Sequence, residues 1–224
     1  MRRFDVIRAG IVSHEIVADE MKRLQNLRIG NKIPDTLILV EHPEVVTIGP
    51  RARNDGVSVP EYYATTPIDR GGGITWHGPG QLVAYPIFHW SLEGESNVAK
   101  VISLLEDWII NSLRPLGIKT QRDERMQGVW HAGQKISSVG LQFMKWVSRH
   151  GFTINYNTPL GRVEGLAGCG LDKGTTTSLT ALGKEGLTRD VLEAMLLSMA
   201  PNSINRGVGE WGVSKALHLD SSKR

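Results

Sequence analysis

The stretch from Arg70 to Ile87, RGGGITWHGPGQLVAYPI, constrains the fold more than any other part of the chain. Three consecutive glycines and the later His77-Gly78-Pro79-Gly80 allow the backbone to approach another molecule closely, because glycine has no side chain and tolerates positive φ. The apolar residues from Leu82 to Ile87 predict a strand, which would anchor this segment to a sheet. The stretch therefore predicts a binding wall that carries His77.

The whole sequence has the composition of an ordinary globular protein. It has 224 residues, of which 40% are hydrophobic and 22% charged, and this predicts a single domain with a core from about 36 to 200 and a loosely held tail over 202–224. The sequence contains no apolar run of about 18 residues and no apolar N-terminal segment of the signal-peptide type. We therefore expect a cytoplasmic protein that does not enter membranes.

Three amphipathic segments predict helices. Ser13 precedes a stripe of Val17, Met21 and Leu24, and Ser96 or Asn97 precedes the clearest helix, which should end at 115–117. Thr188 predicts the start of the last helix, which Pro201 should stop. The residues expected to face the core from this helix are Val191, Leu192, Met195 and Leu196.

Short apolar runs predict the strands. TLILV (36–40) and VVTIG (45–49) suit buried strands, and His42 between them is interpreted as a turn residue. From 118 to 157 the apolar residues repeat every second position between glycines, which favours a mainly antiparallel meander. Together the segments predict an α+β fold in which helices pack on a mixed, largely antiparallel sheet.

Several common functions are disfavoured by the sequence. It has no P-loop motif, and Gly207, Gly209 and Gly212 spell G-x-G-x-x-G without a predicted strand before them or a helix after them. The seven histidines show no pair at ligand spacing, so no metal is expected. The net charge of +3 is too small to indicate nucleic acid, but it would suit an acidic protein partner.

The single cysteine, Cys169, is the main candidate for chemistry. It cannot form a disulfide within the chain, and it could be either an inert buried thiol or a reactive one. Its glycine-rich loop, GLAGCGLDKG, favours the reactive interpretation. Because only the thiolate attacks, a nearby cation or base is needed, and the candidates are Lys135, His77 and His150. Lys135 heads a predicted strand and could instead be a solvated edge residue.

These motifs resemble one known family. RGGGITWHGPGQLVAYPI, EHPEVVTIG, GQKISSVGLQF, HGFTINYN and the Cys-Gly loop followed by TSL occur in the order found in octanoyltransferases, the lipoyl(octanoyl) transferase or lipoate-protein ligase B family. The resemblance spans about 36–182. It implies the fold of biotin and lipoate ligase catalytic domains, and acyl transfer from octanoyl acyl carrier protein to a lysine of a lipoyl domain.

The resemblance also implies site residues and partners. Cys169 matches the nucleophile that holds the acyl thioester, and Lys135 matches the lysine that tunes it. The segments matching the acyl pocket are Arg70, Gly71, Gly72, Gly73, Ile74, Thr75, Trp76 and His77, then Ser138, Val139 and Gly140, then Gly151, Phe152 and Thr153. The partners implied are acyl carrier protein and the lipoyl domains of 2-oxoacid dehydrogenase complexes and the glycine cleavage H protein. We expect a monomer with no cofactor.

Three positions depart from the family pattern. Trp76 stands in place of the usual Tyr, Phe152 in place of Leu, and Gly168 in place of the proline before the cysteine. The first two predict a changed acyl preference, and Gly168 predicts a larger entropic cost of ordering the cysteine loop.

Two alternatives stay open, an ATP-dependent lipoate or biotin ligase of the same fold and a non-catalytic module that binds an acyl chain or carrier protein. A nucleic-acid binder is disfavoured because basic and aromatic residues are not interleaved.

Overall fold

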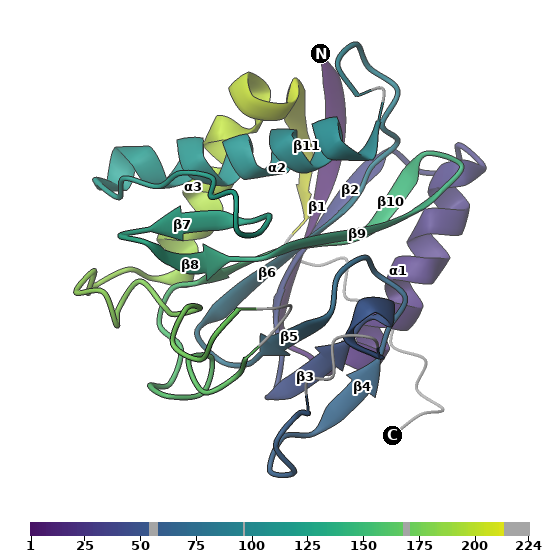
Figure 1. Cartoon of the computed structure of the whole chain (residues 1–224). Helices are drawn as coiled ribbons and strands as arrows, with labels where there is room; N and C mark the ends of the chain where they lie inside the picture. The colour runs from purple at the N-terminus through teal and green to yellow at the C-terminus, as the bar shows by residue number, and fades with distance from the viewer. Residues whose placement is uncertain (54–57, 96, 168–170, 213–224) are drawn as a thin grey trace.

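A mixed sheet of six strands, in the order β11-β1-β2-β6-β10-β9, forms the centre of the molecule (Figure 1). The computed structural model describes residues 1–53, 58–95, 97–167 and 171–212. In this sheet β1 is parallel to β2 and β11, and the other three pairings are antiparallel. The described strands are β1 (Arg2–Ile11), β2 (Asp35–Glu41), β3 (Val45–Ile48), β4 (Thr65–Pro67), β5 (Ile74–His77), β6 (Gln81–Ile87), β7 (Val129–His131), β8 (Gln134–Ser137), β9 (Val139–Met144), β10 (Val147–Asn155) and β11 (Arg206–Gly212). The predicted α+β fold class is confirmed.

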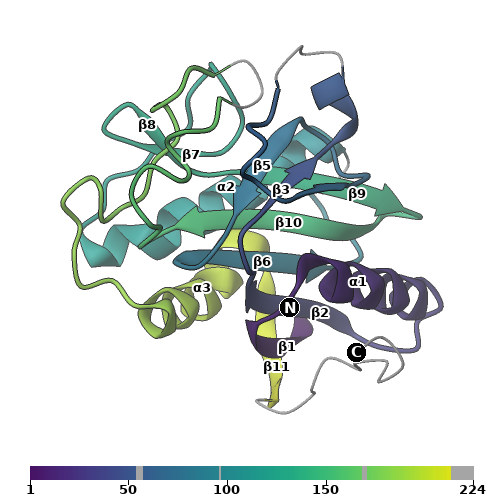
Figure 2. The same cartoon turned by 90° about the horizontal axis from the view of Figure 1, so that it is seen from below.

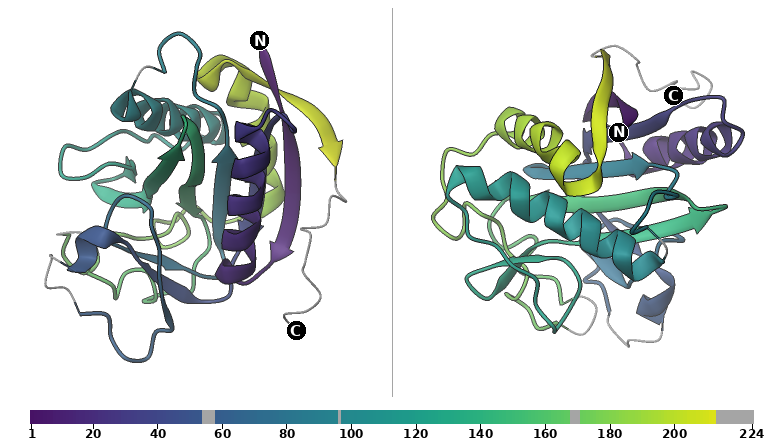
Figure 3. Two further views of the ribbon diagram at one scale, coloured as in Figure 1. Left: turned by 90° about the vertical axis from the view of Figure 1, so that its right-hand side faces the viewer. Right: turned by 90° about the horizontal axis from the view of Figure 1, so that it is seen from above.

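Helices cover both faces of this sheet (Figures 1 and 3). Helix α1 (His14–Ile29) packs on one face, while α2 (Val98–Leu113) and α3 (Arg189–Ile204) pack together on the other. The alternation along β6 explains the two layers, since Leu82 and Ala84 join the core under α2 and α3, whereas Val83 and Tyr85 join the core under α1. Among the described residues, no helix combines the length and apolarity needed to span a bilayer.

The predicted helix starts are confirmed. Ser13 is the N-cap of α1, and Asn97 and Thr188 cap α2 and α3 by accepting hydrogen bonds from the backbone N–H groups of Lys100 and Val191. Such caps satisfy amide groups that have no partner inside the helix. A short 3₁₀ turn (Arg114–Leu116) follows α2 and ends in a left-handed glycine, as the sequence indicates.

Two smaller sheets lie beside the large one. The sheet β4-β3-β5 lies near the start of α1, whereas the β7–β8 hairpin packs toward α2. Figure 2 shows β3 and β5, which belong to the sheet β4-β3-β5, next to the β7–β8 hairpin. A separate apolar cluster that includes Val46, Ile74 and Trp76 holds the first of these to the segment around Val163 and Leu166. We call the stretch from Arg70 to Ile87 the glycine-rich wall, and it joins a small sheet, through β5, to the large sheet, through β6.

The structure corrects the expectations at the C-terminal end. The prediction that Pro201 ends the last helix is wrong, because α3 continues to Ile204, where buried Ala200 and Ile204 anchor it. The prediction that Val191 faces the core is also wrong, since it is 39% exposed while Leu192 is buried. The tail expected to be loose from 202 instead forms β11 over 206–212, paired with the unpredicted strand β1. Residues 213–224 lie outside the described part.

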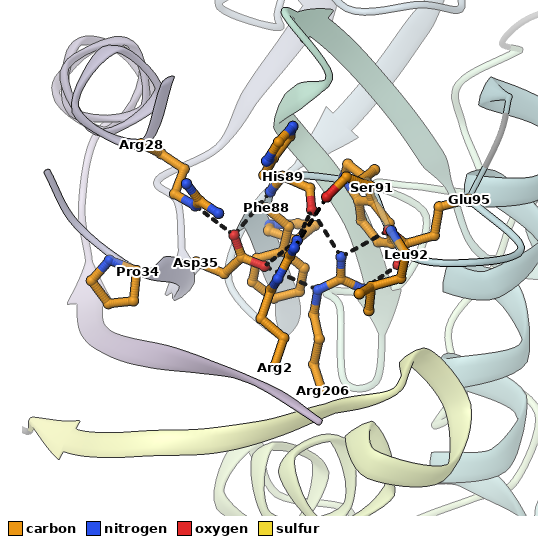
Figure 4. A network of polar contacts seen from close by, with 12 residues as sticks. Arg2, Arg28, Pro34, Asp35, Phe88, His89, Ser91, Leu92, Glu95 and Arg206 are labelled. Atoms are coloured by element: carbon orange, nitrogen blue, oxygen red, sulfur yellow. Dashed lines mark hydrogen bonds and ion pairs between the residues drawn. The ribbon is translucent and has the colours of Figure 1, made fainter. Parts of the chain in front are cut away.

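A buried ionic network fixes β11 to the sheet (Figure 4). Arg206 is fully buried and donates hydrogen bonds to Asp35 Oδ2 at 3.1 Å and to Glu95 Oε1 at 2.5 Å. Arg28 Nε donates to the other oxygen of Asp35 at 2.7 Å. The guanidinium of Arg206 also lies 4.5 Å from the centre of the Trp90 ring. We call Arg206, Asp35, Glu95 and Arg28 the Arg206 network.

Candidate functional site

A cavity of about 210 Å³ opens between the glycine-rich wall and the β7–β8 side of the molecule, and we call it the outer cavity. Several elements supply its lining, which includes Lys135 of β8 and the polar side chains of Gln81 and Asn155. The predicted site residues on its lining are Arg70, Gly71, Gly72, Gly73, Ile74, Thr75, Trp76, Lys135, Ser138 and Val139. The structure thus gathers residues from three separate sequence segments around one space.

Lys135 enters this cavity from a tightly held backbone. Its N–H donates to the carbonyl of Thr175 at 2.8 Å, and its own carbonyl accepts from Thr177 N–H at 2.9 Å. Its side chain runs past Gly128, where an added Cβ would lie 2.6 Å from Lys135 Cε and 2.2 Å from the Ser137 carbonyl oxygen. Only glycine fits there. Lys135 is 5% exposed, so it is not the solvated edge residue that the sequence left open.

Cys169, the predicted nucleophile, lies outside the described residues, as does Gly168. The described residues on either side of this gap, Leu166 and Leu171, both line the outer cavity. Of the three groups considered for activating Cys169, Lys135 is the one that shares a cavity with these two leucines. The assignment of Cys169 and Lys135 to catalysis stays a prediction.

A smaller cavity of about 30 Å³, the inner cavity, adjoins the outer one. The two share Arg70, Thr75, Ser138 and Val139 in their linings. The remaining predicted pocket residues lie on the inner cavity, namely His77, Gly140, Gly151, Phe152 and Thr153. An added Cβ at Gly140 would lie 3.0 Å from Arg70 Cδ, so the absence of a side chain there makes room for the buried arginine.

A continuous chain of hydrogen bonds runs through the wall of both cavities. Gln81 Nε2 donates to Asn155 Oδ1 at 2.8 Å, so its Oε1 is free to accept from His77 Nδ1–H, also at 2.8 Å. His77 Nε2 is 3.2 Å from Thr47 Oγ1, which in turn accepts a hydrogen bond of 2.9 Å from Arg70. These bonds fix the orientation of each polar side chain around the space.

Four buried histidines gather at the inner cavity, and three of them line it. We call His14, His42, His77 and His150 the histidine cluster. The ring of His14 lies 5.3 Å from that of His42, 5.9 Å from that of His77 and 6.4 Å from that of His150. Sequence analysis assigned His42 to a turn, but it is also fully buried, with Nδ1–H donating to the Val12 carbonyl and Nε2 2.8 Å from the Tyr85 hydroxyl.

Burial keeps this cluster uncharged at neutral pH. It lowers the pKa of His14 to about 3, with His42 as a further cause, and it lowers the pKa of His42 to about 4. Burial also lowers the pKa of His150 to about 4, although Asp69 acts in the opposite direction, and it lowers the pKa of His77 well below its usual value. The histidines considered as bases therefore accept protons poorly, because the charged form is desolvated.

Trp76 and Phe152, two of the departures from the family pattern, differ in what they face. Trp76 is 2% exposed, lies on the lining of the outer cavity and donates from Nε1 to Glu44 at 2.9 Å. Phe152 contributes to the lining of the inner cavity, but its ring packs against Trp108 with 5.5 Å between ring centres. The Phe152 ring thus points into the core beneath α2, so the expectation of a changed acyl preference has less support at Phe152 than at Trp76.

Sequence reasoning missed several residues of the site. Gln81 and Asn155 fall inside the motifs HGPGQ and HGFTINYN, so their position in these motifs was an available signal. His14 had no such signal, because only the packing of α1 brings it to the other histidines. Among the described residues, no group of three His, Cys, Asp or Glu could hold a metal ion.

Known proteins resemble this chain in both sequence and fold. Residues 18–200 match the family described as the lipoyl protein ligase A/B catalytic domain. An octanoyltransferase of Caldicellulosiruptor saccharolyticus is 37% identical over 191 residues, which is 81% of each chain. The fold is similar to that of a lipoate-protein ligase A solved with ATP (TM-score 0.70, 14% identity, 93% of this chain and 87% of that one). It is also similar to a biotin protein ligase from Aquifex aeolicus (TM-score 0.52, 12% identity, 92% and 70%).

Proposed function

The chain belongs to the lipoyl protein ligase A/B catalytic domain family as a relative of its octanoyltransferases, and from this we propose its reaction. It moves an octanoyl group from octanoyl acyl carrier protein to a lysine of a lipoyl domain, the first step in making protein-bound lipoate. Cys169 holds the acyl group as a thioester between the two half-reactions. The observation that carries the proposal is the buried Lys135 in a cavity lined by the glycine-rich wall and by Leu166 and Leu171.

The proposed reaction has two half-reactions, and Lys135 gives a proton in the first and takes one back in the second. The Cys169 thiolate attacks the thioester carbon, and the bond from that carbon to the carrier sulfur breaks as Lys135 gives its proton to the departing thiol. The amine of the acceptor lysine then attacks the acyl-enzyme, the bond to Cys169 breaks, and Lys135 takes up the proton that the amine loses. Backbone N–H groups of the glycine segments stabilise the oxyanion of each tetrahedral intermediate.

The partners follow from the same proposal. Acyl carrier protein is the donor, and lipoyl domains of 2-oxoacid dehydrogenase complexes and the glycine cleavage H protein are the acceptors. The net charge of +3 would favour encounter with an acidic carrier protein. A thioester donor is already activated, so the reaction requires no ATP and no cofactor. The enzyme would work as a cytoplasmic monomer.

Intact-mass spectrometry tests the proposal. After mixing with octanoyl acyl carrier protein, the wild type should gain the mass of one octanoyl group on Cys169, and Cys169→Ala should gain none. Lys135→Met should form the adduct about 10² to 10⁴ times more slowly, whereas Lys173→Met, a matched change at an exposed lysine, should behave as wild type. Full transfer to a lipoyl domain by Cys169→Ala would overturn the proposal.

The two rival functions give different results in the same assay. An ATP-dependent ligase, supported by the fold shared with a lipoate-protein ligase solved with ATP, would need ATP and would tolerate the loss of Cys169. A non-catalytic acyl-binding module would bind the carrier protein without forming any adduct.

A further inference from the structure

The outer and inner cavities continue toward a groove on the α1 side of the molecule. This surface groove has a volume of about 500 Å³ and is bordered by Glu15, Lys22 and Arg149. It shares three lining residues, His14, Ile68 and His150, with the inner cavity. The inner cavity in turn shares Arg70, Thr75, Ser138 and Val139 with the outer one. The three spaces therefore lie in series, from Lys135 to the surface beside α1.

The wall between the inner cavity and the surface groove consists of the three shared side chains. His150 is held in place because its ring is 3.0 Å from Asp69 Oδ1 and its backbone belongs to β10. Ile68 is held by a backbone hydrogen bond of 3.0 Å to the Ile48 carbonyl. His14 is the first residue of α1 and is 5% exposed, and within the described part of the chain its ring contacts other rings but makes no hydrogen bond. Removing the His14 ring would thus open the wall without breaking a described hydrogen bond.

We propose that His14 is a specificity-determining residue that stops the acyl chain at the inner end of its channel. This inference rests on the proposed function, in which the thioester lies beside Lys135 and the alkyl tail points away from it into the inner cavity. The inner cavity, about 30 Å³, has room for one small group such as a terminal methyl. A longer tail would collide with the imidazole of His14, and without that ring it would pass into the surface groove.

The chemistry of the wall fits an alkyl end. The imidazoles of His14, His77 and His150 are uncharged at neutral pH because burial lowers the pKa of each. An apolar tail that meets neutral rings displaces no hydrated charge. In the groove beyond, Glu15 and Lys22 are exposed to solvent, so a tail that reached it would gain little burial. His14→Ala should therefore tolerate longer chains rather than prefer them.

The test compares carrier proteins that bear chains of eight, twelve and sixteen carbons. In the wild type, kcat/KM should fall steeply beyond eight carbons. In His14→Ala the ratio of the twelve-carbon to the eight-carbon kcat/KM should rise about tenfold or more. Ile68→Ala opens the same wall from another side chain and should shift the ratio in the same direction. Lys22→Ala, which changes only the groove, should leave the ratio at the wild-type value.

Binding of free fatty acids separates this inference from the proposed function. Isothermal titration calorimetry with octanoate and dodecanoate should show the same shift in relative affinity for His14→Ala, whether or not acyl transfer occurs. If the wild type transfers no acyl group from any donor, the proposed function fails, and the binding ratio still decides the role of His14. If folded His14→Ala and Ile68→Ala both keep the wild-type ratio in binding, the inference is overturned. Should His14→Ala fail to fold, Ile68→Ala alone decides it.

Discussion

Two buried polar regions of this molecule are built in opposite ways. In the Arg206 network, the charged side chains of Arg206, Asp35 and Glu95 are almost completely buried, and each charge meets an opposite one (Figure 4). In the histidine cluster, the rings pack mostly against one another, and Asp69 is the one carboxylate that the described structure pairs with any of them. The first region is built from matched opposite charges, whereas the second stays neutral because protonation would be poorly compensated.

The position of each region explains this difference. The Arg206 network joins β11, β2 and the segment before α2, and none of its four members lines the cavities described above. Three members of the histidine cluster, His14, His77 and His150, line the inner cavity. Matched ions hold distant strands together, whereas neutral rings line the side of the inner cavity next to the surface groove, where the end of an alkyl chain is proposed to lie. The role of a buried polar group therefore depends on whether an opposite charge lies beside it.

The largest effect on stability is expected from the Arg206 network. Arg206→Met should lower the free energy of unfolding by about 3–5 kcal/mol, because it leaves buried Asp35 and Glu95 without their shared cation. Urea denaturation measures this loss. Arg125→Met removes an ion pair whose arginine side chain is 51% exposed, and it should cost far less than Arg206→Met because solvent screens the pair. Equal losses in the two variants would show that the Arg206 network is not a stabilising unit.

The histidine cluster should give the next largest effect, and only in acid. Because burial lowers the pKa of His14 to about 3 in the folded protein, against about 6.5 unfolded, the unfolded chain binds the proton first as the pH falls below 6.5. Stability due to neutral His14 is thus present above pH 6.5 and is lost progressively toward pH 3. His14→Phe should reduce the loss of unfolding free energy between pH 7 and pH 5 by about 2 kcal/mol.

Urea denaturation of both proteins at the two pH values checks this prediction. If wild type and His14→Phe lose the same unfolding free energy between pH 7 and pH 5, folding does not lower the pKa of His14. The comparison depends on the difference between the two pH values, so a constant change in stability caused by the larger ring does not affect it.

The smallest effect is expected at Trp76, which lines a cavity, as the histidine cluster does, and contacts an ion pair, as members of the Arg206 network do. Its ring borders the outer cavity, and its N–H donates to Glu44, which also pairs with Arg162. Trp76→Phe should cost about 1 kcal/mol of unfolding free energy, because one partly buried hydrogen bond is lost while most of the apolar ring remains. Trp146→Phe, at a tryptophan that is 42% exposed, is the matched control and should change stability by less than about 0.5 kcal/mol. A larger loss of unfolding free energy in Trp146→Phe than in Trp76→Phe would contradict a stabilising role for the hydrogen bond from Trp76 to Glu44.

Much of the fold was predictable because its signals are local. The caps at Ser13, Asn97 and Thr188 and the alternation in the meander depend on residues a few positions apart, and the structure has these elements where the sequence indicates them. The strands β1 and β11 were missed because each is stabilised by pairing with a segment distant in sequence. Pro201 was misjudged because the burial of Ile204 outweighs the local preference of proline to end a helix.

For the candidate site, the sequence indicated which segments of chain take part but not how their side chains are buried and directed. The residues matched to the family's acyl pocket all lie on the outer or inner cavity, so the motifs identified segments that meet around adjoining spaces, and their role in acyl binding stays a prediction. The motifs could not indicate that Lys135 is buried against Gly128, or that the ring of Phe152 turns away toward Trp108. Burial and ring direction depend on which face of a strand meets which neighbour, and this depends on the register of the whole sheet.

The sequence by itself determined the class of fold, the family and the segments that form the cavity wall, since each depends on residue type and local spacing. The tertiary structure alone decided how these segments meet. It placed His14 of α1 beside His77 of the glycine-rich stretch and His150 of β10, three residues with more than sixty positions between each and the next along the chain. It also aligned the outer cavity, the inner cavity and the surface groove. Such long-range contacts follow from packing helices on both faces of one sheet, and no local pattern records them.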